Sequence, residues 1–187
     1  MIPIPDAATG LLPPGRHRAG WDEIEEMFVR QAPYSSARRL LFLRLRDWAD
    51  QCWSILPKAE LWIDGSFVRY SADQAPFDVD VVAFAELEDF GAVWARVRDE
   101  LKLAEEDARL GGEPRKCPFA MQFLSLWTMK KVRTDRVSAP RIQPFGSSVD
   151  GFLTPKQTSA QYSWDRSWSG LAAGGPEKGY LEVIPSA

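Results

Sequence analysis

Two aspartates near the middle of the chain have the spacing of a metal-binding pair. Asp78 and Asp80 stand two residues apart at the start of the apolar segment Asp-Val-Asp-Val-Val-Ala-Phe. Side chains alternate between the two faces of a strand, so both carboxylates point to the same side. Neighbouring carboxylates repel each other unless a cation lies between them. The pattern therefore favours a cation such as Mg²⁺ or Mn²⁺, because these ions prefer oxygen ligands.

A glycine–serine pair precedes the two aspartates. Gly65 and Ser66 follow an apolar segment at residues 60–63, and we expect them to open a short helical turn at residues 67–70. A turn that opens a helix offers free backbone N–H groups and a positive dipole end, which suit a phosphate. A phosphate site beside metal-binding carboxylates favours phosphoryl or nucleotidyl transfer.

The elements that must position these residues follow from hydrophobic periodicity and from the proline and glycine breaks. The pattern predicts helices at residues 21–29, 36–56 and 88–104. It predicts strands at residues 60–63, 79–84, 120–127 and 179–184. This order indicates an α/β or α+β fold, in which helices flank a mixed sheet. We expect residues 1–20 to form an irregular arm, and residues 21–187 to form one domain with a C-terminal extension from about residue 128.

Length and composition indicate a globular protein inside the cell. The chain has 187 residues, of which 45% are hydrophobic, and its formal net charge is −3. It contains two cysteines, Cys52 and Cys117, which have no metal-site spacing. The N-terminal residues lack the pattern of a signal peptide, and no apolar run approaches the roughly 20 residues that span a bilayer. We therefore expect a cytoplasmic protein without membrane association.

The arrangement of Gly65-Ser66, a spacer and Asp78-x-Asp80 between two apolar strands resembles the DNA polymerase beta-like nucleotidyltransferase superfamily. Within that superfamily, the chain is most similar to the small, minimal nucleotidyltransferase-like proteins of bacteria and their mobile elements. It also resembles an uncharacterised bacterial family there. The features that appear shared with that family include Leu-Pro-Pro-Gly-Arg-His at residues 12–17 and Lys-Gly-Tyr at residues 178–180.

This resemblance implies a nucleotidyltransferase sheet, in which Asp78 and Asp80 hold Mg²⁺ or a similar ion. Gly65 would permit the tight turn, and Ser66 would contact the phosphates of a nucleoside triphosphate (NTP). The implied reaction moves a nucleoside monophosphate to a hydroxyl of tRNA, another nucleic acid or a protein. The implied setting is a toxin–antitoxin or phage-defence system.

Active members of the superfamily usually carry a third carboxylate on a later strand, aligned with the first two. The predicted strand at residues 118–126 has none, and Gln122 brings no charge. A catalytically degenerate fold that binds a nucleotide or a protein is therefore the alternative. The two readings differ in geometry. A carboxylate from Asp64, Glu113 or Asp150 within metal reach would favour the enzyme, whereas a site filled by Phe77 or a tryptophan would exclude it.

Two further groups of residues have a functional and an ordinary interpretation. Residues 109–141 hold eight basic side chains against two acidic ones, so Lys130 and Lys131 could contact the triphosphate or an RNA. The same charges also suit a solvated loop. Trp164 and Trp168 lie in a polar segment, where they could stack on bases, bind a protein partner or cover the site. Asp64 could cap the expected helical turn or support the metal ligands from behind.

Overall fold

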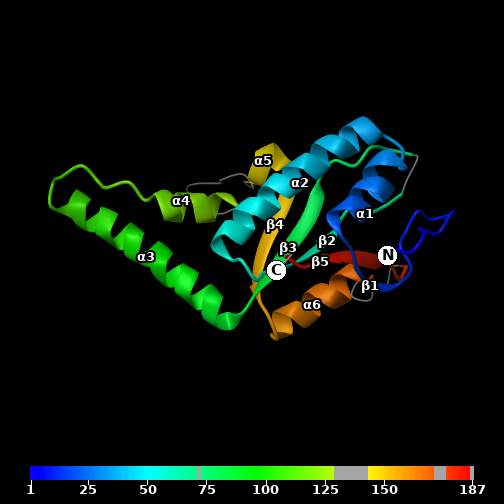
Figure 1. Cartoon of the computed structure of the whole chain (residues 1–187). Helices are drawn as coiled ribbons and strands as arrows, with labels where there is room; N and C mark the ends of the chain where they lie inside the picture. Colours follow the sequence, from blue (N-terminus) through cyan, green and yellow to red (C-terminus); the bar gives the residue numbers. More distant parts are fainter. Residues whose placement is uncertain (71–72, 129–142, 171–175, 186–187) are drawn as a thin grey trace, which may run out of the picture.

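Five strands form one mixed sheet with helices on both faces (Figure 1). The computed structural model describes residues 1–70, 73–128, 143–170 and 176–185. In spatial order the strands are β1 (Gly15–Arg18), β5 (Gly179–Val183), β2 (Glu60–Asp64), β3 (Val79–Ala85) and β4 (Val149–Pro155). Strand β2 is antiparallel to both β3 and β5, whereas β1 is parallel to β5 and β4 is parallel to β3. The predicted α/β fold class is confirmed.

The two faces of the sheet contact different helices. Helix α2 (Ser35–Ile55), with α1 (Trp21–Glu25) and the π-helical stretch η1 (Glu26–Arg30), packs on one face. The apolar side chains of α2 recur at helical spacing, and the buried ones include Leu41, Leu45, Trp48 and Cys52. On the opposite face, α6 (Ser159–Trp168) packs over Trp62, Val82, Phe84 and Tyr180. Alternation along β2 and β3 thus sends every second side chain toward α2 and the others toward α6.

Three more helices lie between β3 and β4 in the described part of the chain. The long helix α3 (Leu87–Arg109) and α4 (Pro118–Ser125) form a hairpin that extends beyond the sheet in Figure 1, and α5 (Pro144–Ser147) precedes β4. The strand predicted at residues 120–127 is therefore wrong, because most of this segment is α4. A short apolar run fits either element, and Pro118 favours a helix start, where its missing N–H costs nothing.

The N-terminal segment is part of the fold, in contrast to the predicted irregular arm. Residues 15–18 form β1, which pairs with β5, and Leu12 is buried in the main core. The carbonyl of Gly10 accepts a hydrogen bond of 2.8 Å from the N–H of Tyr70. This contact joins the first residues of the chain to the segment that follows the glycine–serine pair.

Among the described residues, no helix combines the length and the apolar character that crossing a lipid bilayer requires.

One buried arginine joins three parts of the chain. The side chain of Arg38, in the second turn of α2, is fully buried. Its guanidinium donates hydrogen bonds to four backbone carbonyls, those of Phe28 (3.3 Å), Pro33 (2.8 Å), Phe67 (2.7 Å) and Arg69 (2.6 Å). A planar guanidinium carries five N–H donors, so one side chain can satisfy all four acceptors. Arg38 therefore holds the chain after Gly65 against η1 and α2.

We expect Arg38→Met to lower the free energy of unfolding by about 3–5 kcal/mol, because it leaves buried carbonyls without donors and removes their shared partner. Arg38→Lys keeps the charge but cannot reach four carbonyls, so it should also destabilise the fold. Urea denaturation followed by circular dichroism measures both losses.

The matched control is Arg39→Met, because Arg39 is the next residue of α2, is exposed and forms a 3.7 Å ion pair with Glu25. Its expected loss is below about 0.5 kcal/mol. Equal losses for the Arg38 and Arg39 variants would show that the buried contacts contribute no more than a surface charge.

Candidate active site

Three aspartates meet at one end of the sheet, on the face that α6 partly covers. Asp80 of β3 pairs in register with Asp150 of β4, and Asp78 precedes Asp80 by two residues. Oxygen atoms of the three carboxylates lie within 4.8 Å of one another. Asp150 is buried, with 4% of its surface exposed, whereas Asp78 and Asp80 are half-buried. We call these residues the aspartate triad.

The triad supplies the carboxylate that the predicted strand at residues 118–126 lacked. Because β4 runs parallel to β3, Asp150 lies beside Asp80 with its side chain on the same face. Gln122, the substitute considered from the sequence, is exposed on α4. Phe77 does not fill the site, since 78% of its surface is exposed. Of the three carboxylates named as candidates, Asp150 is therefore the one that joins Asp78 and Asp80 in the described residues.

The start of β4 is held against both β3 and α2. The N–H of Val79 donates a 3.1 Å hydrogen bond to the carbonyl of Ser148. The guanidinium of Arg44, on α2, donates to the hydroxyl of the same serine. Ser148 is two residues before Asp150, so these contacts fix the register of Asp150 relative to Asp80.

The glycine–serine pair lies against the triad but opens no helix. Residues 66–68 form one hydrogen-bonded turn, in which the N–H of Val68 donates to the carbonyl of Gly65 at 3.3 Å. The expected helical turn at residues 67–70 is therefore wrong, and with it the expected helix dipole. Gly65 has a φ of +83°, and a Cβ at this position would overlap the carboxylate of Asp80. Only glycine combines this backbone angle with so close an approach.

Ser66 makes hydrogen bonds to the start of β3. Its hydroxyl donates to the carbonyl of Asp78 and accepts from the N–H of Phe77, both at 3.3 Å. These contacts tie the turn to the strand that carries two of the three aspartates. The contact of Ser66 with phosphates stays a prediction, and it would require these long hydrogen bonds to rearrange.

Asp64 forms a buried ion pair rather than a helix cap. It lies on β2, in register with Asp80, and only 4% of its surface is exposed. The ammonium group of Lys178 donates to its carboxylate. Burial raises the pKa of Asp64 to about 6, although Lys178 and the backbone N–H of Gly65 act in the opposite direction. The ion pair thus places Lys178 beside β2, the strand next to the two aspartates of β3. Lys178 was not among the site residues predicted from the sequence.

The basic and aromatic candidates have different outcomes. Lys130 and Lys131 lie outside the described residues, so their contact with a triphosphate or an RNA stays a prediction. Trp164 and Trp168 pack on the sheet: their ring centroids lie 4.9 Å from Phe152 and 5.8 Å from Tyr180, respectively. The indole N–H of Trp164 donates to the hydroxyl of Thr154 at 3.0 Å. The two tryptophans therefore serve the core beneath α6, and the suggestion that they stack on bases is not supported.

The comparisons with known proteins gave one match. Residues 5–184 match a family described as a family of unknown function, DUF6932. No curated protein and no solved structure matches the chain.

We expect Gly65→Ala to lower the free energy of unfolding by about 1–3 kcal/mol, because it forces a side chain into left-handed backbone and against the carboxylate of Asp80. The control is Gly91→Ala in α3, where a Cβ meets nothing within 4 Å. Alanine in a helix interior should raise stability by about 0.5–1 kcal/mol. Thermal unfolding of both variants tests this, and a neutral Gly65→Ala would contradict the close approach.

The ion pair of Asp64 and Lys178 should make stability depend on pH. Because burial raises the pKa of Asp64 above its unfolded value, its protonated form is favoured in the fold, and stability falls as pH rises through about 6. Lys178→Met should raise that pKa further, because it removes the compensating charge. We expect a loss of about 2–3 kcal/mol at pH 8 and a much smaller loss at pH 5.

Asp64→Asn provides the control, since it removes the titrating group. In the Asp64→Asn background, Lys178→Met should cost the same at both pH values, as urea denaturation would show. A pH-independent loss in the wild-type background would mean that the pair contributes no linked protonation.

Proposed function

We propose that this chain, which belongs to the DUF6932 family, is a metal-dependent nucleotidyltransferase that transfers a nucleoside monophosphate from an NTP to a hydroxyl group. The observation that carries the proposal is the aspartate triad: three carboxylates from two adjacent strands within 4.8 Å of one another. The acceptor would be a tRNA-like nucleic acid or a protein side chain. The activity would take place in the cytoplasm, where NTPs and tRNA are present.

The donor set of the triad suits Mg²⁺ or Mn²⁺. All three side chains offer hard oxygen ligands, and no histidine or thiolate competes among the three. Mg²⁺ usually takes one or two protein carboxylates and completes its shell with water and substrate phosphates. Asp78 and Asp80 would hold such an ion, which would supply positive charge to the phosphates of the NTP.

The proposed reaction needs a proton acceptor near the metal ligands. The oxygen of the acceptor hydroxyl attacks the α-phosphorus, the bond from that phosphorus to the bridging oxygen breaks, and pyrophosphate leaves. The hydroxyl proton must go to a base within hydrogen-bond reach. Asp150 fits this role in the proposal, because it lies beside Asp80 at the same height of the sheet.

The turn at Gly65 brings the backbone close to these groups. Because glycine has no side chain, the main chain at Gly65 approaches the carboxylate of Asp80 closely, so its backbone lies beside the triad. Lys178, paired with Asp64 on the adjacent strand, adds a positive charge near this position. Both features support the binding of an anionic substrate beside the triad.

One observation favours the alternative, a degenerate fold that binds a nucleotide or a protein without catalysis. The hydroxyl of Ser66 is engaged by the backbone of Phe77 and Asp78, so it must change partners before it can hold a phosphate. Binding without transfer would support this second reading.

The test is transfer of label from α-labelled NTPs to total RNA or lysate protein in the presence of Mg²⁺ or Mn²⁺. We expect Asp78→Asn, Asp80→Asn and Asp150→Asn each to reduce transfer by about 100-fold or more, because each removes a metal ligand or the base. The control is Asp99→Asn. Asp99 is an exposed carboxylate on α3 and is not part of the triad.

The possible outcomes separate the two readings. Transfer by the wild type that equals transfer by the three variants would overturn the proposal. Absence of transfer, with metal-dependent NTP binding seen by calorimetry, would establish the binding module instead.

A further inference from the structure

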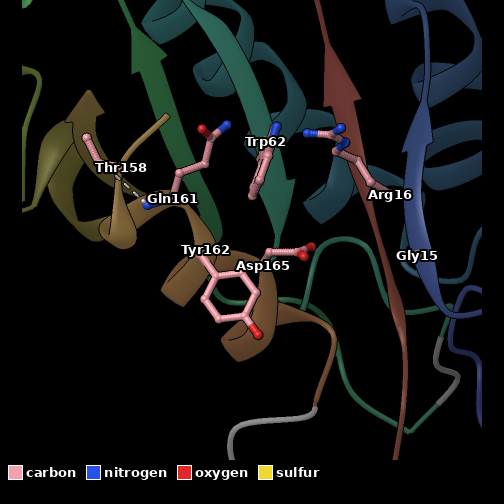
Figure 2. A pocket seen from close by; sticks show the side chains of 7 residues that line it. All are labelled: Gly15, Arg16, Trp62, Thr158, Gln161, Tyr162 and Asp165. Carbon is pink, nitrogen blue, oxygen red and sulfur yellow. Dashed lines mark hydrogen bonds between the residues drawn. The ribbon is translucent and has the colours of Figure 1, made fainter. Parts of the chain in front are cut away.

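A hollow lies on the same face of the sheet as the triad, between α6 and the strands β1 and β2 (Figure 2). Its volume is about 510 Å³, which is within the usual range of sites for small molecules. The side chains that line it come from β1, β2 and α6, and they include Arg16, Trp62, Gln161, Tyr162 and Asp165. None of the three triad aspartates is among its lining residues.

The indole N–H of Trp62 has no hydrogen-bond acceptor among the described residues. Trp62 is almost fully buried, with 2% of its surface exposed, and its ring packs against Phe84 and Tyr180. A buried donor without an acceptor costs about 1–3 kcal/mol. A phenylalanine could fill the same core position without this cost. The unpaired donor at the wall of the hollow is therefore explained if a bound molecule supplies an acceptor.

Two further donors point to the same place. Figure 2 shows the side chains of Arg16 and Gln161 reaching toward the indole of Trp62 from its two sides. The guanidinium of Arg16 lies 4.9 Å from the indole centroid, and its Nε faces Glu182 at 3.3 Å. Within the described part of the chain its terminal nitrogens make no hydrogen bond, so they are available to a ligand. The amide oxygen of Gln161 accepts from the N–H of Gln157 at 2.7 Å, so its NH₂ group is the end available to the hollow.

The carboxylate of Asp165 also lines the hollow, and in Figure 2 it lies below the indole of Trp62, apart from the tips of Arg16 and Gln161. One oxygen of Asp165 accepts the hydroxyl of Tyr180, which sets the orientation of the carboxylate. At the rim, the ring of Tyr162 is 63% exposed. A ligand that fits must therefore offer acceptors to one side, donors to the other and a flat surface to an aromatic ring.

Guanine has this distribution of groups. Its O6 and N7 atoms are acceptors that suit an arginine, and its N1–H and N2 amino group are donors on another edge that suit a carboxylate. An exposed tyrosine ring offers a stacking surface for a base. Adenine keeps the N7 acceptor, but an amino group replaces O6 beside it, and adenine has neither the N1–H nor the N2 amino group that would donate to Asp165.

We propose that this hollow binds a guanine base, either from a free guanine nucleotide or from a guanosine in an RNA strand. The indole nitrogen of Trp62 is covered from solvent, so the base reaches it as the long side chains of Arg16 and Gln161 shift. The proposal does not rest on nucleotidyl transfer, because the hollow excludes the triad and its recognition needs no metal.

The test is calorimetric binding of GMP, IMP and AMP to the full chain in EDTA, with a short RNA that contains one guanosine and a matched RNA of adenosines alone. We expect GMP or the guanosine RNA to bind about 10- to 100-fold more tightly than its adenine counterpart. Binding by GMP identifies a free nucleotide as the source, and binding by RNA alone identifies a strand.

Variants assign the contacts. Asp165→Asn should weaken GMP at least about tenfold and IMP less, because IMP lacks the 2-amino group. Arg16→Gln should weaken both, whereas Arg18→Gln, on the same strand but outside the lining residues, should weaken neither. In NMR spectra, the indole N–H resonance of Trp62, assigned with Trp62→Phe, should shift on addition of GMP in a variant with Asp78→Asn and Asp80→Asn.

Equal binding of the guanine and adenine ligands, or no binding of any at millimolar concentration, would overturn the proposal. Unchanged affinity in both Asp165→Asn and Arg16→Gln would overturn it as well, even if GMP binds elsewhere. A failure of these tests leaves the transfer assay unaffected, since the assay depends on the triad.

Discussion

The order of the candidate active site depends on one buried cation. The guanidinium of Arg38 donates to carbonyls of η1, of the loop before α2 and of the segment after Gly65. Burial lowers the pKa of Arg38, yet arginine remains charged because its ordinary pKa is far above neutrality. The dipoles of the four carbonyls replace the water that the charge loses on burial. The segment after Gly65 is therefore fixed to the core by the hydrogen bonds of Arg38.

The two faces of the sheet explain why the acidic groups gather where they do. On the α2 face, the strands are almost entirely apolar, and this face forms the main core. The α6 face begins with Asp64, Asp80 and Asp150 in one row across β2, β3 and β4 and continues with aromatic residues such as Trp62 and Phe152. Packing under α6 covers the aromatic part of this face. Lys178 compensates the charge of Asp64 and Asp80 is half-buried, whereas Asp150 is buried with 4% of its surface exposed.

The sequence predicted those parts of the site that local patterns encode. The strand that carries Asp78 and Asp80 is a run of valines, and its apolar character is visible without a partner strand. The strand of Asp150 was missed because Gly151 and Pro155 interrupt its pattern, and its pairing with β3 spans about 70 residues of chain. The sequence predicts a strand at residues 120–127, most of which is α4, because a short apolar run does not distinguish the two element types. The role of Arg38 could not be predicted, since an arginine on an amphipathic helix is ordinarily exposed and its acceptors are brought to it by the tertiary fold.

The pairing of the sheet has a consequence for the way the protein folds. Strand β5 lies between β1 and β2, so β1 joins the sheet through residues 179–183, which are 164 residues further along the chain than their partners in β1. Until β5 pairs, β1 lacks its described neighbour strand, and Asp64 lacks its ion pair with Lys178. Contacts of such long sequence separation slow folding, because the entropy of closing the loop is lost before the contacts form. The pairing of β5 with β1 and β2 should therefore form after the local contacts of the helices, and the ion pair of Asp64 and Lys178 should form with it.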